Sequence, residues 1–170
     1  APQFHPGLPT ERYYEEEGRA ELTPRDFGIL MHRVFENAAT TDEIYMAIEA
    51  MTQDGVLDEK EAPRLRELVE KALADPVTAE WFGGRWQVVR NENEIILPGS
   101  GTTRRPDRVM TDGERAVVVD YKFGDRETAR HRKQIREYLR LLRQMGYTRT
   151  EGYLWYVRLG RTERVEEKED

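Results

Sequence analysis

Two aspartates and a lysine near the middle of the chain have residue types and a spacing that suit metal-assisted chemistry. Asp107 precedes Asp120 by thirteen positions, and Lys122 follows Asp120 by two. Two carboxylates held side by side repel each other, and hard divalent ions such as Mg²⁺ prefer oxygen ligands of this kind. A neighbouring lysine can orient or deprotonate a water, or stabilise negative charge on a phosphate. Taken alone, Asp120-Tyr121-Lys122 could equally be the end of a strand with a surface ion pair, which contributes little stability.

A hairpin between the aspartates is needed to bring them together. The polar run 111–114, Thr-Asp-Gly-Glu, separates two apolar runs, and Asp-Gly in that setting predicts a tight turn. The turn predicts strands over about 106–110 and 115–122. Folding there places Asp107 beside Asp120.

The second of these strands would deliver its charges to the edge of a hydrophobic core. Side chains two apart on a strand share a face, so Asp120 and Lys122 point the same way and Tyr121 points opposite. The apolar run 116–119 predicts a buried strand. Asp120 therefore ends a core strand, where an unpaired charge is costly. This position favours a functional site over a surface ion pair.

Residues 126–145 have the periodicity of a helix that could complete the site. Apolar residues recur there at spacings of three and four, and Gly146 supplies a stop signal. Gln134 and Tyr138 are four apart, so they lie on one helical face. Tyr138 could be a core residue flanked by Gln134, or the two could position the lysine, an aspartate or the substrate backbone. The aromatic and aliphatic run 151–157 predicts a further core strand.

The order of these motifs resembles the PD-(D/E)XK nuclease superfamily. The segments that carry the resemblance are RRPDRV (104–109), VVVDYKFG (117–124), QIREY (134–138) and GYLWYV (152–157). The chain is most similar to the RecB-like nuclease domain at the C-terminus of bacterial UvrD/Rep-type helicase–nucleases, the AddA and RecB or exonuclease V beta subunit type. The resemblance implies an α/β fold with a restriction-endonuclease-like core, in which a mixed central sheet is flanked by helices and preceded by a helical segment.

The resemblance also implies roles for individual residues, with Mg²⁺ or Mn²⁺ as the cofactor. Segment 26–36, with Gly28 four residues before His32, is similar to the family's G-x-x-x-H helix, whose histidine is a metal ligand. A partly buried histidine with a structural hydrogen bond is the alternative for His32. Glu92 occupies the place of the family's glutamate, and Glu94 is the competing position. The implied metal ligands are His32, Asp107, Asp120 and the carbonyl of Tyr121, and the other implied catalytic residues are Lys122, Glu92, Gln134 and Tyr138.

Periodicity and turn signals predict one domain of helices followed by strands. The resemblance implies a nuclease domain over 24–158, and we expect a linker or extended arm over 1–23 and an acidic C-terminal tail over 159–170. Helices are expected over 24–38, 41–52 and 59–74, with Thr41 and Asp58 as N-caps, and a helical turn over 76–82. Strands near 85–90, 94–98, 104–110, 115–122 and 151–157 are expected to form one mixed sheet.

Composition limits the cofactors that the chain can hold. The 170 residues include no cysteine, which excludes a thiolate-ligated iron–sulfur cluster or zinc site. A helicase motor needs a G-x-x-x-x-G-K-[ST] loop, and the glycine-rich run 99–103 has no lysine. We therefore expect no nucleotide site here. The resemblance implies a helicase motor in a part of the polypeptide outside this sequence. A second nuclease subunit could be a further partner.

The charge distribution gives a mixed indication of DNA binding. The chain has 27 basic and 33 acidic residues and a net charge of −6, whereas a DNA-binding domain is usually basic. Its basic residues cluster, however, at Arg104, Arg105 and Arg108 and along the helix after Lys122. That helix could contact DNA phosphates or be a solvated face. Its basic set is Arg126, Arg130, His131, Arg132, Lys133, Arg136, Arg140 and Arg143.

The expected activity is Mg²⁺- or Mn²⁺-dependent hydrolysis of DNA, by an exonuclease that acts in DNA end processing and recombinational repair. The expected substrate is DNA that is single-stranded or contains an end. No long apolar run or signal-peptide pattern occurs, so we expect no membrane partner and a location in the bacterial cytoplasm. The alternative is a catalytically inactive nuclease fold that binds DNA or a protein.

Overall fold

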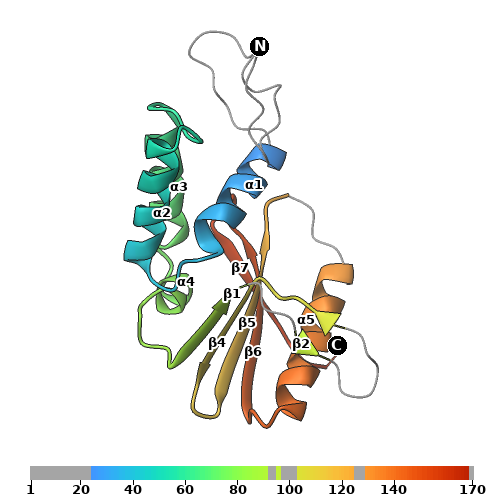
Figure 1. Ribbon diagram of the computed structural model, residues 1–170. Coiled ribbons are helices and arrows are strands. Elements are labelled where there is room, and N and C mark those ends of the chain that lie inside the picture. Colours follow the sequence, from blue (N-terminus) through green and yellow to red (C-terminus); the bar gives the residue numbers. More distant parts are fainter. Residues whose placement is uncertain (1–23, 92–94, 97–102, 125–128, 169–170) are drawn as a thin grey trace.

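A computed structural model describes residues 24–91, 95–96, 103–124 and 129–168 of the chain (Figure 1). Its helices are α1 (Pro24–Phe35), α2 (Thr41–Gln53), α3 (Glu61–Ala72), α4 (Pro76–Trp81) and α5 (Ala129–Gln144). Its strands are β1 (Val88–Asn91), β2 (Ile95–Ile96), β3 (Thr103–Arg104), β4 (Arg108–Asp112), β5 (Arg115–Lys122), β6 (Arg149–Tyr156) and β7 (Arg161–Val165). Within these ranges, no helix has the length and apolar character needed to cross a lipid bilayer.

Side-chain hydrogen bonds to the backbone mark the region where α2 and α3 begin. The N-cap of α2 is Thr40, one residue before the predicted Thr41, because its hydroxyl accepts a hydrogen bond from the Glu43 N–H (3.3 Å). At α3, the Asp58 carboxylate accepts a hydrogen bond from the Glu61 N–H (2.7 Å). The Glu61 carboxylate accepts one in return from the Asp58 N–H (3.2 Å). These reciprocal bonds have the pattern of a capping box. The N-cap of α3 is nevertheless Lys60, not the predicted Asp58, and Lys60 makes no side-chain capping bond.

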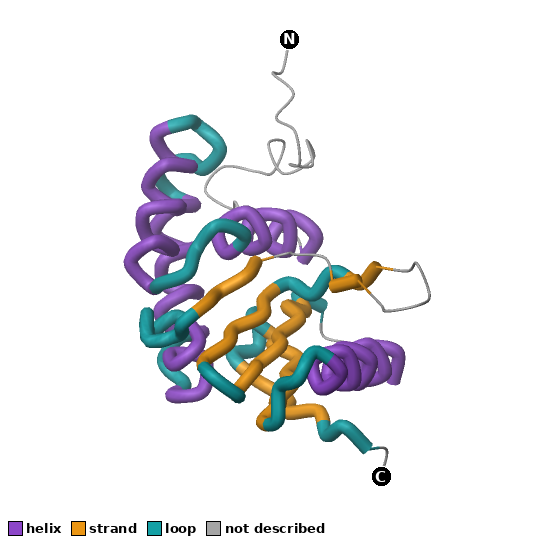
Figure 2. Tube along the Cα trace, turned by 60° about the horizontal axis from the view of Figure 1, so that its bottom comes forward, coloured by secondary structure: helices purple, strands orange, loops and turns teal. Residues whose placement is uncertain are grey.

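Five strands form a mixed sheet in the order β1-β4-β5-β6-β7 (Figure 2). β4 and β5 are the predicted antiparallel hairpin, and Gly113 adopts a φ of 58° in its turn. β5 and β6 are parallel and are joined through α5, because a parallel pair needs a long crossover. β1 and β7 pair antiparallel at the two edges. A mixed sheet flanked by helices confirms the predicted α/β class.

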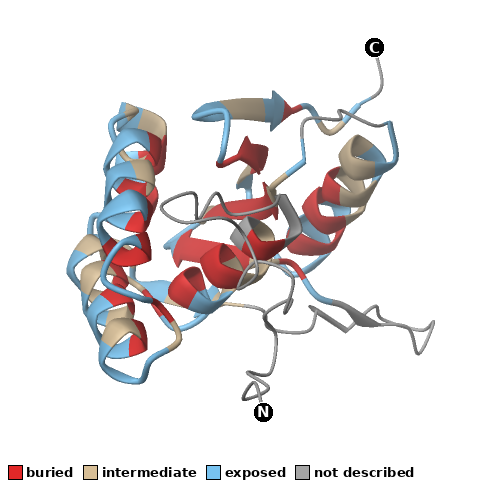
Figure 3. Ribbon diagram, turned by 90° about the horizontal axis from the view of Figure 1, so that it is seen from above, coloured by how far each residue is buried: buried red, intermediate tan, exposed pale blue. Residues whose placement is uncertain are grey.

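The sheet separates two hydrophobic cores. Val117, Val119 and Tyr121 pack with residues of α1–α4 on one face. Ala116 and Val118 pack with α5 on the other face. The buried sides of α1 and α5 accordingly face the sheet from opposite directions (Figure 3). Alternation along β5 therefore decides which helical layer each side chain meets.

Helix α5 lies unusually close to the sheet at Gly152 in β6. A Cβ atom on Gly152 would lie 2.4 Å from the Ile135 Cγ2 and 3.2 Å from the Leu139 Cδ2. β6 is paired with β5, the strand that carries Asp120 and Lys122. The close contact at Gly152 therefore sets how far α5 lies from that strand.

Two predicted strand assignments were wrong. Residues 95–96 pair with residues 103–104 in a separate two-stranded sheet, so the strand expected over 94–98 is not part of the mixed sheet, and the one expected over 104–110 is split. Residues 161–165, expected in the acidic tail, form β7. β7 is an edge strand of mostly charged residues held by backbone pairing with β6, and Val165 is its one buried residue. Such a strand has little of the apolar alternation that marks a strand in a sequence.

Candidate active site

Asp107 and Asp120 lie side by side where β4 begins and β5 ends. The backbone N–H of Asp107 donates to the Asp120 Oδ1 (3.1 Å), and the N–H of Tyr121 donates to the Asp107 Oδ2 (2.7 Å). Each carboxylate thus binds the backbone of the opposite strand. The other oxygen atoms, Asp107 Oδ1 and Asp120 Oδ2, accept no hydrogen bond from the described residues. The structure therefore brings the two predicted aspartates together and leaves an oxygen of each for a cation.

Burial and mutual repulsion both act on this acidic pair. The pKa of Asp107 is raised to about 6, first by burial and then by the charge of Asp120, against smaller opposing effects of His32, the Tyr121 N–H and Lys122. Burial also raises the pKa of Asp120, against the charge of Lys122. A divalent cation would relieve both causes of the shift, because it replaces lost hydration and cancels repulsion.

His32 reaches the pair from α1. Its Nδ1 lies 3.7 Å from the Asp107 Oδ1, and its side chain is about a third exposed. Its ring packs edge-on against Phe123, with centroids 5.0 Å apart. Phe123 also fills the room that Gly28 leaves, since a Cβ on Gly28 would lie 3.3 Å from the Phe123 Cδ2. The glycine one turn before the histidine is therefore explained by Phe123, which the sequence analysis did not single out.

Lys122 lies on the same face of β5 as Asp120 and is half-buried. The pKa of His131 is lowered by burial and then by the charge of Lys122, which shows that the lysine also lies near the first turn of α5. One turn further along α5, the amide of Gln134 donates to the Tyr138 hydroxyl (3.1 Å). Tyr138 itself is buried in the core between α5 and the sheet. The lysine thus faces the helix that carries the predicted glutamine and tyrosine.

Comparison with protein families finds a match for residues 7–170 in the PD-(D/E)XK nuclease superfamily. The chain belongs to this superfamily. Its members are typically nucleases that cleave phosphodiester bonds, and they generally use a divalent metal such as Mg²⁺. Membership indicates nuclease activity and implies DNA as the substrate. The search of curated proteins gave no match.

The donor set of this PD-(D/E)XK domain fits a hard divalent cation. Two carboxylates with partly removed hydration supply oxygen ligands, and both are destabilised as charged groups by their surroundings. Among the described residues, no three His, Asp or Glu side chains converge closely enough to form a ready three-ligand cluster. The two carboxylates would therefore hold the ion first, and the His32 Nδ1 lies 3.7 Å from one of their oxygens, Asp107 Oδ1.

Two predicted contributors are placed less directly. The N–H of Tyr121 holds Asp107, while its side chain lies on the opposite face of β5 and is buried among α1–α4 residues. A role for the Tyr121 carbonyl stays a prediction. Glu92 and its competitor Glu94 lie outside the described residues, as does Arg126, and their predicted roles also remain untested.

The sequence places Arg108 in a cluster of basic residues, but the structure shows that it does not contribute to a basic surface. Its side chain is completely buried, so it cannot contact a phosphate on the surface. It follows Asp107 in the chain and points to the α1–α4 side of the sheet, under the Phe82 ring, 3.9 Å from the ring centroid. Strand alternation from the inward-facing Met110 could have indicated this burial, but a charged residue type argued against it. Of its predicted neighbours, Arg105 is exposed.

The basic face of α5 is partly neutralised by the C-terminal segment of the same domain. Arg132 donates to Glu163 (2.5 Å), Arg143 pairs with Glu167, and Arg136 donates to the Glu166 carbonyl (3.3 Å). Arg130, Lys133 and Arg140 are exposed. Only part of the predicted basic set is therefore available for a phosphate backbone.

Proposed function

We propose that this PD-(D/E)XK domain is a Mg²⁺- or Mn²⁺-dependent deoxyribonuclease whose centre is the Asp107–Asp120 pair. The observation that carries the proposal is the juxtaposition of a half-buried and a buried carboxylate, both of raised pKa, with Lys122 and His32 at one end of the sheet. Carboxylates in this condition gain stability when a divalent ion binds. A purely structural pair would instead be matched to an arginine or lysine.

Each residue has a separable role in this proposal. Asp107, Asp120 and His32 hold the ion, assisted by the Tyr121 carbonyl. A bound divalent ion lowers the pKa of a coordinated water and neutralises phosphate charge. Lys122 orients the attacking water or supports negative charge on the phosphate. The remaining predicted residues, Gln134, Tyr138 and Glu92, hold the substrate, the lysine or a water.

We further propose that the domain is the nuclease module of a bacterial helicase–nuclease of the AddA or RecB type. In that setting it acts as an exonuclease on single-stranded or end-containing DNA during end processing and recombinational repair, in the cytoplasm. A helicase motor elsewhere in the polypeptide, and a second nuclease subunit, would deliver the strand. The motif order from Asp107 to Tyr138 supports this origin, and the exposed Arg130, Lys133 and Arg140 could guide the strand to the site.

The proposal is tested by incubating labelled linear single- and double-stranded DNA with the protein and Mg²⁺, Mn²⁺ or EDTA. We expect degradation that needs the metal and is lost in Lys122→Ala. A matched control is Lys71→Ala, because Lys71 is an exposed lysine on α3 that pairs with Glu67 in the same helix. Intact DNA with wild-type protein under both metals, also when the full-length polypeptide is used, would favour the inactive DNA- or protein-binding alternative.

A further inference from the structure

Arg108 is a fully buried cation whose hydrogen-bond acceptors are all neutral. It is 0% exposed, and among the described residues no carboxylate is hydrogen-bonded to it. Its terminal nitrogens donate to the carbonyls of Ala38 (2.6 Å), Ala39 (2.9 Å) and Trp81 (2.7 Å) and to the Asn91 Oδ1 (3.1 Å). One side chain thus ties β4 to the α1–α2 loop, to the end of α4 and to β1.

Burying the charge of Arg108 among neutral acceptors costs folding free energy, so we expect this arginine to serve another purpose. Burial lowers the pKa of Arg108, and the nearby Tyr121 and Glu43 offset only part of that effect. A buried charge without a carboxylate partner is rarely retained for stability alone, since apolar packing of similar volume often stabilises as well or better. The benefit of Arg108 is therefore expected to lie in the geometry that its planar fork imposes.

The location of Arg108 links it to both halves of the acidic site. It is the residue after Asp107, and Arg108–Val119 is the last pair of the β4–β5 ladder. Asp107 therefore lies one residue beyond the paired part of β4, and two carboxylate-to-backbone hydrogen bonds join it to Asp120 and Tyr121 of β5. Asp120 itself stays paired with Leu154 of β6. On the reverse face, the guanidinium lies beside the buried hydroxyl of Tyr121, without meeting hydrogen-bond geometry.

We propose that Arg108 is a positioning residue that holds the Asp107 backbone against β5 and so keeps the two carboxylates together despite their repulsion. This inference rests on the proposed nuclease function for its catalytic consequence, but the local geometry that it describes does not. A displacement of about 1 Å in a catalytic group can cost on the order of a hundredfold in rate. Arg108 acts on the site through Asp107 and Tyr121 and touches neither substrate nor metal.

The test compares Arg108→Lys with Arg115→Lys. Arg115 opens the same hairpin at its turn end and is held by Glu80 and Glu151, far from the acidic pair along β5. Both substitutions keep the charge and remove the fork. Amide hydrogen exchange is measured at Asp107 and Tyr121, together with Mn²⁺ affinity by calorimetry and the kcat and KM for linear DNA.

We expect Arg108→Lys to speed exchange at the Asp107 and Tyr121 amides, weaken Mn²⁺ binding and lower kcat, each by about tenfold or more, with KM for DNA unchanged. Arg115→Lys should leave these values within about twofold of wild type, the scale of a surface substitution. Wild-type exchange rates at the Asp107 and Tyr121 amides in Arg108→Lys, or unchanged Mn²⁺ affinity, would overturn the proposal and reduce Arg108 to a structural role.

If Arg108→Lys does not fold, Asn91→Ala replaces it, because this change removes the side-chain acceptor that orients the Arg108 guanidinium (3.1 Å). It should speed exchange at the Asp107 amide and weaken Mn²⁺ binding in the same sense, and the absence of both effects would overturn the proposal. Exchange and metal affinity are measured without DNA. A protein that never cleaves DNA, but loses Mn²⁺ affinity in Arg108→Lys, would therefore refute the nuclease proposal and support the positioning one.

Discussion

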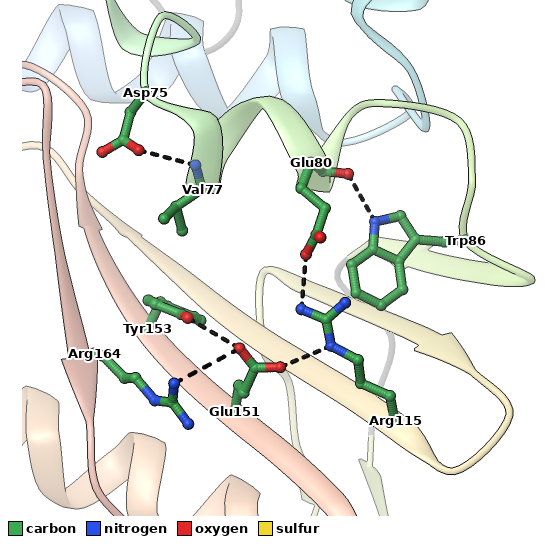
Figure 4. A network of polar contacts seen from close by, with 8 residues as sticks. All are labelled: Asp75, Val77, Glu80, Trp86, Arg115, Glu151, Tyr153 and Arg164. Carbon is green, nitrogen blue, oxygen red and sulfur yellow. Dashed lines mark hydrogen bonds and ion pairs between the residues drawn. The ribbon is translucent and has the colours of Figure 1, made fainter.

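The acidic side chains at the two ends of the β4–β5 hairpin have opposite surroundings. At the turn end, Glu151 accepts hydrogen bonds from Arg115 (2.7 Å) and from the Tyr153 hydroxyl (3.0 Å), and Arg115 also binds Glu80 (2.7 Å) (Figure 4). At the other end, Asp107 and Asp120 face each other, and the adjacent arginine, Arg108, gives its hydrogen bonds to neutral groups.

The difference appears in the pKa values. Burial would raise the pKa of Glu151, but the hydrogen bonds from Arg115 and Tyr153 hold it below its usual value. The pKa of Asp107 is instead raised to about 6. An arginine lies next to Asp107 in the chain, yet its guanidinium points to the other face of the sheet. The turn end thus satisfies its acids from within the protein, whereas the acidic pair is left for an external cation, as expected where function overrides local stability.

The largest expected effect is the loss of DNA cleavage when a charge is removed from the acidic pair. Asp120→Asn removes a charge from the proposed metal site, and we expect cleavage of linear DNA to fall on the order of a thousandfold, since metal stabilisation of the transition state is worth several kcal/mol. The matched change at the turn end, Glu151→Gln, should leave the cleavage rate within about twofold. Comparable losses in both variants would mean that the acidic pair has no special part in the reaction.

The next largest effect is a fall in the free energy of unfolding with rising pH, measured in the presence of EDTA. Asp107 has a pKa of about 6 in the folded protein against an ordinary value near 3.8. A folded-state pKa above the unfolded one gives stability that is complete below about pH 4 and lost as pH rises through 6. Since each pKa unit corresponds to about 1.4 kcal/mol, the loss is on the order of 3 kcal/mol.

Urea unfolding at a series of pH values measures this loss, and Asp107→Asn should flatten the curve between about pH 4 and 6. Glu151 should act in the reverse direction, because its folded-state pKa is lowered. Its contribution is present at neutral pH and lost as pH falls through its folded-state pKa. A wild-type curve with the same slope as Asp107→Asn would show that Asp107 is not held in an unfavourable charged state.

A divalent cation should reverse the destabilisation at the acidic end. A ligand that binds only the folded state adds about 2.7 kcal/mol at a hundred times its Kd. We therefore expect Mg²⁺ or Mn²⁺ to raise the melting temperature of the wild type at neutral pH and to have little effect on Asp120→Asn. Glu151→Gln should respond to the metal as the wild type does. Equal metal responses of wild type and Asp120→Asn would place the ion elsewhere.

The acidic end of the hairpin could be predicted because its signals are local. An Asp-Gly turn and the alternation along 115–122 determine the register, and the register places Asp107 opposite Asp120. The helical periodicity around Tyr138 was equally local, and α5 lies where it indicated. These patterns also supported the superfamily resemblance, which the match over residues 7–170 confirms at the level of the superfamily.

Features that depend on contacts between distant segments could not be predicted. The burial of Arg108 depends on the carbonyls of Ala38 and Trp81, far away in the sequence. The contact between Gly28 and Phe123 joins α1 to the residue after β5. β7 consists mainly of charged residues whose pairing is made by backbone groups, so neither composition nor periodicity marked it as a strand. For Arg108 and Gly28 the deciding contact joins segments that are far apart in the sequence, so a local pattern of residue types does not reveal it.

The smallest expected effect is that of Tyr153→Phe at the turn end, which should change the stability of the protein but not its activity. Tyr153→Phe removes only the hydroxyl that donates to the Glu151 Oε1, and Arg115 still binds the other oxygen of that carboxylate. The free energy of unfolding should fall by about 1 kcal/mol, the usual net value of one such hydrogen bond. Cleavage and Mn²⁺ affinity should stay unchanged, because the β4–β5 ladder separates this carboxylate from the acidic pair. A change in Mn²⁺ affinity would mean that the strands transmit strain from one end to the other, and the two ends would then have to be treated as one coupled network.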